Sequence, residues 1–267
     1  MNPLCKWSGG KRTEIPLFRE FYPQEYNTFI EPFVGGGAVY FDLNFEGQNV
    51  INDIHPELVN FYRVIASGRA QEIYDIVSTW GTDETSYYQY RGTGAKGTFT
   101  PQTDVELAAR FIYLRKTAFR GMMRYNKKGE FNIPYGKYKN VKFDELLDPN
   151  YQNLLSRTEV NLGSYKEIFD RYNSSDNFVF LDPPYDSEFN DYGFDDFNRQ
   201  SQIELAEIFK TTQNKCMIVI GGTPFIRELY DGYIVHEYPK NYSFKIYAGR
   251  VGQEINVNHL VICNYEQ

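Results

Sequence analysis

A group of four residues that directly follows an apolar run is suited to hold a planar nucleic-acid base that carries an exocyclic amine. Asn177–Leu181 (NFVFL) predicts a fully buried strand, and Asp182-Pro183-Pro184-Tyr185 follows it directly. Open α/β sheets place their ligands at this end of a strand. The Asp182 carboxylate and the Pro183 carbonyl can accept both N–H bonds of an exocyclic amine, which frees its delocalised lone pair. The prolines stiffen the turn and Tyr185 offers a stacking face, so base chemistry is favoured over a plain surface turn.

A second pattern indicates a cofactor that contains a nucleoside. The β-prone run Thr28–Val34 ends in Gly35 to Gly37, and an alternating apolar stretch follows from Ala38 to Leu43. Glycines at a strand-to-helix turn let a ligand approach the backbone near the helix N-terminus. Asp53 ends the next β-prone run, about 20 residues on, where an acceptor for ribose hydroxyls is expected. NAD, FAD and S-adenosylmethionine all fit, and a purely structural turn stays an alternative.

Positive charge gathers in two places along the chain. Lys6-Trp7-Ser8-Gly9-Gly10-Lys11 places two lysines and a tryptophan around a small-residue turn, which could hold an anionic group and a flat ring. From Arg110 to Lys142 there are ten Lys or Arg against one acid, Glu130, in a chain of 267 residues with net charge −7. The overall charge argues against a nucleic-acid partner, but the basic block indicates a local polyanion-binding surface rather than a merely solvated face.

The segments around these motifs predict an α/β core that is split by a basic, mostly helical insert. In the core we expect, besides the elements above, strands at 49–52, 160–162, 216–220 and within 233–265, and helices at 165–172 and 201–212. In the insert we expect helices at 58–66, 70–80 and 105–118 and a β-hairpin at Asn126–Gly129. The expected organisation is a catalytic core of residues 1–56 and 151–267, and an inserted DNA-binding target-recognition domain of residues 57–150.

Several classes of protein are disfavoured by the sequence. No apolar run is long enough to cross a bilayer, and residues 1–11 lack the apolar region of a signal peptide. The three cysteines are an odd number at no metal-ligand spacing, and the three histidines are scattered. We therefore expect an intracellular, cytoplasmic protein without a metal site, a disulfide framework or a membrane partner.

The order of the motifs resembles one known family essentially from end to end. The chain is similar to the DNA adenine methyltransferases of the Dam family, with the cofactor motif first, the recognition insert in the middle and Asp-Pro-Pro-Tyr last. The match is densest from Phe111 to Tyr138, which includes Gly129-Glu130-Phe131-Asn132 and Pro134-Tyr135-Gly136-Lys137-Tyr138. The resemblance implies a doubly wound, Rossmann-like S-adenosylmethionine-dependent methyltransferase core with an inserted target-recognition domain. It also implies bacterial, phage or viral origin.

The resemblance also implies roles for residues around the cofactor and the target adenine. Asp53 would contact the ribose, and Lys11 would lie near the methionine carboxylate of S-adenosylmethionine. Asp182, Pro183 and Tyr185 would hold an adenine that has been flipped out of the duplex. The full set of implied cofactor contacts is Trp7, Lys11, Phe33, Gly35, Asp53, Ser164, Tyr165 and Asp182.

In the insert, the resemblance implies residues that read DNA. Phe119 would wedge beside the flipped base and Arg124 would read a guanine, the commonest specific contact of arginine. The other implied DNA contacts are Met122 and Pro134 at the thymine and its neighbour, Lys6 and Tyr138 at the outer guanine, and Arg120, Asn126, Asn132 and Lys137. We also assign Arg115, Lys116, Lys127, Lys128 and Lys139 to phosphates. Packing of the hairpin is the alternative for Phe119 and Met122, and Arg120 stands where the family usually has a small polar residue.

These features predict direct transfer of a methyl group to N6 of adenine in duplex DNA, with S-adenosylhomocysteine as product and GATC as the target. The family also implies a monomer, with or without a restriction enzyme beside it. The alternatives are another short palindrome, RNA, cytosine N4 or a glutamine side chain as substrate, and a DNA-binding relative without catalysis. A nicotinamide oxidoreductase fits the glycine turn but leaves Asp182 to Tyr185 unexplained.

Overall fold

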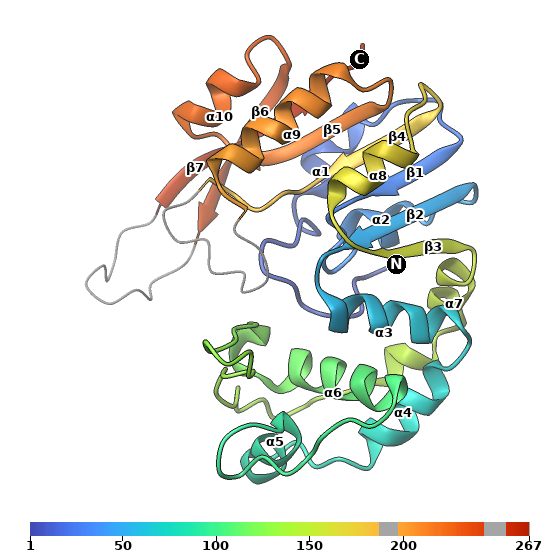
Figure 1. Ribbon diagram of the computed structural model, residues 1–267, viewed down its shortest axis with the longest axis vertical. Helices are drawn as coiled ribbons and strands as arrows, with labels where there is room; N and C mark the ends of the chain where they lie inside the picture. The colour runs from blue at the N-terminus through green and yellow to red at the C-terminus, as the bar shows by residue number, and fades with distance from the viewer. Residues whose placement is uncertain (187–196, 243–254, 267) are drawn as a thin grey trace. The chain divides into compact units, whose positions relative to one another are not determined.

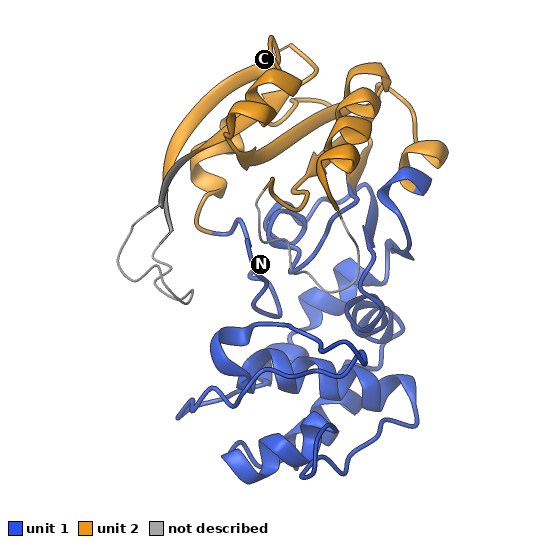
Figure 2. Ribbon diagram, turned by 60° about the vertical axis from the view of Figure 1, so that its left-hand side comes forward, with its two compact units in different colours: residues 1–12, 31–167, 191–195 blue, residues 13–30, 168–190, 196–267 orange. Residues whose placement is uncertain are grey.

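The structure is a computed structural model that describes residues 1–186, 197–242 and 255–266, and its helices and strands are labelled in Figure 1. The described residues fall into two compact units, coloured separately in Figure 2. The first unit contains residues 1–12 and 31–167. The second contains residues 13–30 and the described residues from 168 onward.

The strands form one mixed sheet, which confirms the predicted α/β class. Its strands are β1 (Thr28–Glu31), β2 (Gln48–Asp53), β3 (Thr158–Leu162), β4 (Asn177–Leu181), β5 (Lys215–Gly221), β6 (Ile234–Tyr242) and β7 (Ile255–Cys263). The order across the sheet is β3-β2-β1-β4-β5-β7-β6. Five strands run parallel and β7 pairs antiparallel with both β5 and β6. This is a Rossmann-like sheet of the kind expected from the sequence.

The helices predicted from the sequence are all present, together with further helices and short turns. They are α1 (Ile15–Phe18), η1 (Arg19–Phe21), α2 (Ala38–Leu43), α3 (Pro56–Ala66), α4 (Ala70–Ser78), α5 (Glu84–Arg91), α6 (Asp104–Thr117), η2 (Phe119–Gly121), η3 (Asp144–Leu147), α7 (Pro149–Leu155), α8 (Tyr165–Arg171), α9 (Arg199–Thr211) and α10 (Pro224–Leu229). Helices α1, α5, α7 and α10 and the short turns η1, η2 and η3 are additions that the sequence did not predict. None of the described helices is long and apolar enough to span a membrane.

In the first unit, α6 is the central helix of the predicted insert. It begins with a capping box, in which the Thr103 hydroxyl accepts from the Glu106 amide and the Glu106 carboxylate accepts from the Thr103 amide. The predicted apolar side of α6 is buried, but so are Phe111, Leu114 and Arg115, so the helix is covered on more than one side. Polar side chains of α6, such as that of Arg115, are therefore buried within the first unit.

In the second unit, the core is built around the parallel strands. All five residues of β4 are buried, as the sequence predicted, and so are Thr28, Phe29 and Ile30 of β1. The ring of Phe178 on β4 packs against those of Tyr22, Tyr26 and Phe29 at centroid distances of 5.2 to 5.6 Å. This packing anchors the amino-terminal part of β4, the strand that leads to Asp182.

Candidate active site and DNA interface

The glycine turn and the end of β2 form one hydrogen-bonded group in the first unit. Gly35 has φ +47°, and its N–H donates to the Asp53 carboxylate at 2.8 Å. A Cβ at Gly35 would lie 2.6 Å from ring atoms of Trp7, so only glycine fits against the tryptophan. The ring of Trp7 meets that of His55 edge-on at 5.6 Å. Three of the predicted cofactor residues, Trp7, Gly35 and Asp53, are therefore neighbours.

Asp53 is half-buried, and its ionisation is affected accordingly. It accepts a second backbone hydrogen bond, from the N–H of His55 at 2.9 Å. Burial nevertheless outweighs these bonds and raises the pKa of Asp53 to about 6. Burial also lowers the pKa of His55 to about 3, and its neutral Nδ1 accepts from the Leu58 N–H at 3.2 Å. The acidic end of β2 is thus poised to change charge near neutral pH while the neighbouring histidine stays neutral.

A buried asparagine that the sequence analysis missed brings the other predicted cofactor residues together. The amide of Asn52 donates to the carbonyls of Pro32 at 2.9 Å and of Gly163 at 3.0 Å. It thereby ties the segment before Phe33 to the segment before Ser164, and the rings of Phe33 and Tyr165 meet at 5.1 Å. The pair offers an aromatic surface against which a flat ring can pack. Lys11 is 1% exposed and donates from Nζ to the Gly9 carbonyl at 3.3 Å.

The Asp182-Pro183-Pro184-Tyr185 turn belongs to the second unit, at the carboxyl end of β4. Pro183 is buried, while Asp182 and Tyr185 are partly accessible. The turn is held from α9, where the side-chain amide of Gln202 donates to the Pro184 carbonyl at 2.7 Å. Asp182 and Tyr185 therefore lie in a rigid turn, as chemistry on a held base requires.

A buried polar cluster lies behind Tyr185, and the sequence analysis had read its histidine as an ordinary residue. The ring of Tyr185 meets that of His259 edge-on at 5.5 Å. His259 is 1% exposed, and its Nδ1 lies 2.6 Å from Glu14, which also accepts from the Tyr238 hydroxyl at 2.9 Å. No pattern in the sequence signalled this cluster, because its members come from α1's flank, β6 and β7. It gives the stacking face of Tyr185 a fixed support.

The predicted hairpin of the insert is present and orients the arginine expected to read guanine. The N–H of Asn126 donates to Glu130 at 2.9 Å, and that of Asn132 donates to Arg124 at 3.0 Å. Across the hairpin, Nε of Arg124 donates to the side-chain carbonyl of Asn132 at 2.8 Å. Among the described residues the two terminal nitrogens of Arg124 have no partner. Asn132 thus fixes the plane of a guanidinium that still offers donors.

The other predicted DNA contacts lie around the hairpin on the first unit. Nζ of Lys6 lies 4.8 Å from the centroid of the Tyr138 ring, which brings together the two residues expected at the outer guanine. Phe119 is 38% exposed, so its ring is accessible to a binding partner. The other predicted contacts in this region that are exposed or partly exposed are Arg120, Met122, Asn126, Lys127, Lys128, Pro134, Lys137 and Lys139.

Two of these residues have a strained backbone. Arg120 and Lys137 both have φ +56°, a conformation that costs free energy in residues other than glycine and asparagine. The small polar residue that the family usually has at the position of Arg120 would accept this conformation more readily. Strain of this kind gathers at functional sites, so it fits the expected DNA contacts.

Two of the phosphate assignments are wrong. Arg115 is 2% exposed, and its guanidinium lies under the Trp7 ring, so it cannot reach DNA. Lys116 donates from Nζ to the Lys142 carbonyl at 2.7 Å and to Glu145 at 2.8 Å. Arg115 points into the unit because α6 is packed on several sides, whereas Lys116 is partly exposed and engaged in an ion pair. A net positive charge in the sequence reveals neither arrangement.

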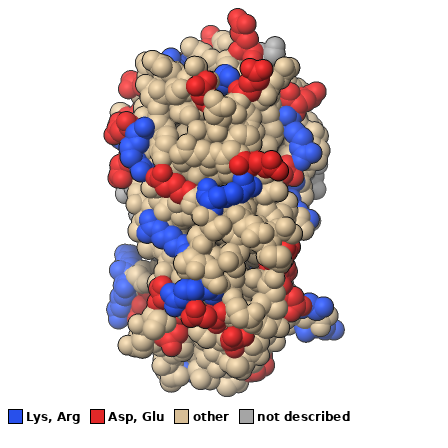
Figure 3. Space-filling view, turned by 90° about the vertical axis from the view of Figure 1, so that its right-hand side faces the viewer, with Lys and Arg blue, Asp and Glu red and all other residues tan. Residues whose placement is uncertain are grey.

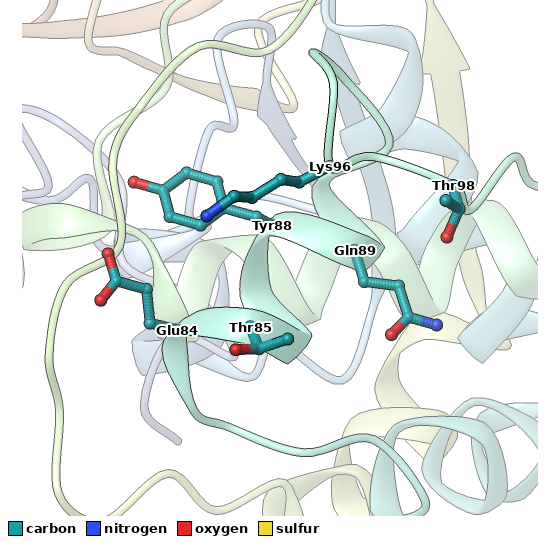
Figure 4. Close-up of a pocket in the computed structure, with 6 residues that line it drawn as sticks. All are labelled: Glu84, Thr85, Tyr88, Gln89, Lys96 and Thr98. Carbon is teal, nitrogen blue, oxygen red and sulfur yellow. The ribbon is translucent and has the colours of Figure 1, made fainter.

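One pocket in the described part of the chain lies apart from these residues. A pocket beside α5 is lined by Glu84, Thr85, Tyr88, Gln89, Lys96 and Thr98, none of which is a predicted site residue (Figure 4). On the face drawn in Figure 3, basic and acidic side chains are interspersed. Among the described residues, no group of His, Cys, Asp or Glu is arranged to hold a metal ion.

Comparison with known proteins identifies the class of enzyme to which this Rossmann-like chain belongs. A family model described as D12 class N6 adenine-specific DNA methyltransferase matches residues 7–244. Type II methyltransferase M.CviBI of Paramecium bursaria Chlorella virus NC1A is 51% identical over 266 residues, which cover 99% of this chain and 100% of that protein. Type II methyltransferase M1.LlaDCHI of Lactococcus lactis subsp. cremoris is 31% identical over 277 residues, with 99% and 96% covered. The DNA adenine methylase of Haemophilus influenzae is 29% identical over 239 residues, with 86% and 83% covered.

The chain therefore belongs to the D12 class of N6 adenine-specific DNA methyltransferases. It is an enzyme that methylates adenine in DNA, as the resemblance of its motifs predicted.

Proposed function

We propose that this methyltransferase takes its methyl group from S-adenosylmethionine and transfers it directly to N6 of an adenine flipped out of duplex DNA. The observation that supports this most is the rigid Asp182 to Tyr185 turn at the carboxyl end of β4, with Tyr185 supported by His259. Asp182 and the Pro183 carbonyl accept the N–H bonds of the adenine amine, and Tyr185 stacks on the base. When bound, S-adenosylmethionine supplies the electrophilic methyl group, and S-adenosylhomocysteine is left.

The residues of the first unit fit this cofactor. The absence of a Cβ at Gly35 lets the Trp7 ring pack directly on the backbone of the glycine turn, so an aromatic face and the turn lie side by side. Asp53 is a carboxylate at the place where ribose hydroxyls are bound in sheets of this type. We assign Phe33 and Tyr165 to the cofactor's adenine, with Ser164 beside them, and Lys11 to its carboxylate.

The proposed organisation follows the expected boundaries, with residues 57–150 as the target-recognition domain between two parts of the catalytic core. Arg124 reads a guanine, Phe119 fills the stack beside the flipped base, and Met122 and Pro134 contact the thymine side. These base-contacting residues favour GATC as the target sequence. The similar viral protein is named a Type II methyltransferase, which favours the presence of a partner restriction enzyme. We also expect the protein to be an intracellular monomer.

The test is methyl transfer from labelled S-adenosylmethionine to a long unmethylated duplex, with every modified position identified. Modification of adenine confined to GATC supports the proposal in full. Adenine in another short motif keeps the chemistry and replaces the target. Transfer to single-stranded RNA but not to duplex DNA overturns the assignment of the basic insert.

The proposal predicts how pH controls cofactor binding through Asp53. Its pKa of about 6 lies above the ordinary value of 3.8, so the protonated carboxyl predominates at pH 5. Ribose hydroxyls donate to the ionised carboxylate, so binding lowers this pKa and affinity is lost as pH falls through 6. We expect S-adenosylhomocysteine to bind roughly tenfold more weakly at pH 5 than at pH 7, measured by titration calorimetry.

Asp53→Asn provides the control for this prediction. The variant should bind more weakly at pH 7 but with an affinity that does not change between pH 5 and pH 7. A pH dependence that is the same in the variant and the wild type would assign it to another group. Because the ionised form is the one disfavoured by burial, the wild type should also lose stability relative to the variant as pH rises from about 4 to about 6.

The tip of the hairpin should contribute charge without specificity. Lys127 and Lys128 are exposed on the turn between Asn126 and Glu130. Replacing both by alanine should lower the slope of log affinity against log salt by about 1 to 2, because each phosphate contact releases about one counterion. The measurement is binding of one duplex at a series of salt concentrations. A slope equal to that of the wild type means that neither lysine touches phosphate.

A further inference from the structure

Arg115 is a buried cation that the proposed chemistry does not use. It lies in the last turn of α6, is 2% exposed, and its Cζ is 4.9 Å from the centroid of the Trp7 ring. One terminal nitrogen donates to the carbonyl of Lys6. Its Nε has no hydrogen-bond partner, and among the described residues no carboxylate forms a salt bridge with it.

Burying a guanidinium without a carboxylate is costly, and a methionine or leucine would fill similar space at lower cost. Desolvation accordingly lowers the pKa of Arg115. The guanidinium shares a hydrogen bond with the buried thiol of Cys5. It also gains the π face of Trp7 and the Lys6 carbonyl, two contacts that no apolar side chain could make together. The position is therefore suited to holding these two neighbouring residues in a fixed arrangement.

Lys6 and Trp7 are adjacent in the chain but serve different parts of the first unit. The Trp7 ring packs on Gly35 of the cofactor turn, within 2.6 Å of where a Cβ would be. The Lys6 side chain instead extends over the Tyr138 ring at 4.8 Å. Arg115 contacts the ring of Trp7 and the backbone carbonyl of Lys6. A shift of the cofactor turn or of the Tyr138 region would therefore move the Lys6–Trp7 peptide in either case.

The turn η2 packs against Lys6 and Arg115 and so restrains the Lys6–Trp7 peptide further. Gly121 has φ +61°, and a Cβ there would lie 3.0 Å from the Arg115 carbonyl and 3.1 Å from Cβ of Lys6. The chain from Phe119 to Gly121 thus packs on both residues. The expected wedge residue Phe119 is joined to the same small cluster.

We propose that Arg115 is a positioning residue that couples occupancy of the cofactor site to readout of the outer base pair by Lys6 and Tyr138. The inference rests on the proposed roles of Trp7, Lys6 and Tyr138. Because coupling between two binding sites is reciprocal, a bound cofactor tightens binding of the correct duplex, and the correct duplex tightens binding of cofactor by the same factor.

The experiment measures duplex affinity with and without S-adenosylhomocysteine. Two duplexes are compared: an unmethylated one that contains the sequence which the enzyme methylates, and one altered only at the outer base pair. In the wild type, cofactor should tighten target binding by roughly 5- to 150-fold, the usual range of such coupling. Arg115→Met should bring this factor close to one and reduce discrimination at the outer pair. Discrimination at the base pair read by Arg124 should be unchanged, because that arginine is held by Asn132.

Two further variants make the result specific. Arg115→Lys keeps the charge but loses the planar fork, so it should retain part of the coupling, and it carries the test if the methionine variant does not fold. Lys116→Met removes the same charge from the next residue, whose partners Lys142 and Glu145 lie outside the cluster, and should leave the coupling factor as in the wild type.

Each outcome separates this inference from the proposed function. Weaker binding of cofactor and of all duplexes, with the coupling factor unchanged, would show that Arg115 only stabilises the fold. Wild-type protein that binds both ligands without coupling overturns the inference alone. Wild-type protein that does not bind S-adenosylhomocysteine overturns the proposed function itself.

Discussion

Replacing Asp182 by alanine should reduce methyl transfer at least about 100-fold at saturating S-adenosylmethionine and DNA, the usual effect of deleting one electrostatic contact to the reacting group. The lone pair of an adenine amine is delocalised into the ring, so the nitrogen is a poor nucleophile until its N–H bonds are held out of the ring plane. Asp182 supplies one of the two acceptors, and the rigid turn positions it. The rate should be measured in a single turnover, which excludes product release.

The matched control is Asp186→Asn, which removes the same charge four residues further along. Asp186 pairs with Arg199 at 2.9 Å and accepts from the Thr223 hydroxyl at 3.1 Å, and an asparagine in its place removes the charge while its side-chain carbonyl can still accept from Thr223. Turnover should therefore stay within a few-fold of the wild type. An Asp182→Ala protein with an unchanged melting temperature and undiminished turnover would contradict the mechanism.

Replacing Arg124 by alanine should relax discrimination at one base pair by roughly 5- to 150-fold, which corresponds to about 1–3 kcal/mol. The guanidinium is held in one plane by Asn132, and its terminal nitrogens are positioned to donate together to the edge of a guanine. The measurement compares kcat/KM for duplexes that differ only at that pair.

Lys127→Ala is the control for the arginine, because a phosphate contact on the same hairpin positions the protein without reading sequence. It should weaken binding of all duplexes by a similar factor. If Arg124→Ala also weakens all duplexes equally, the arginine is a phosphate contact and the target sequence is read elsewhere.

Elements with a strong local pattern were predictable from the sequence. The strand β4 and the long helices α3, α4 and α6 have apolar residues at the spacing of their secondary structure, and the hairpin has Asn126 and Gly129 at its turn. Helix α5 was not predicted because it is polar and buries only Tyr87, whose hydroxyl donates to the Ile133 carbonyl 46 residues away. Such a helix is stabilised by a contact that no local window contains.

By itself the sequence determined where chemistry is possible, because an Asp-Pro-Pro-Tyr turn and a glycine turn each lie within a few residues of the strand that places them. Only the tertiary structure decided what supports them. Glu14 meets His259 across 245 residues, and Arg115 meets Lys6 across 109. Whether a charged side chain reaches solvent or lies under a tryptophan depends on which surfaces of α6 are covered, and this follows from packing between distant segments rather than from the charge of any one of them.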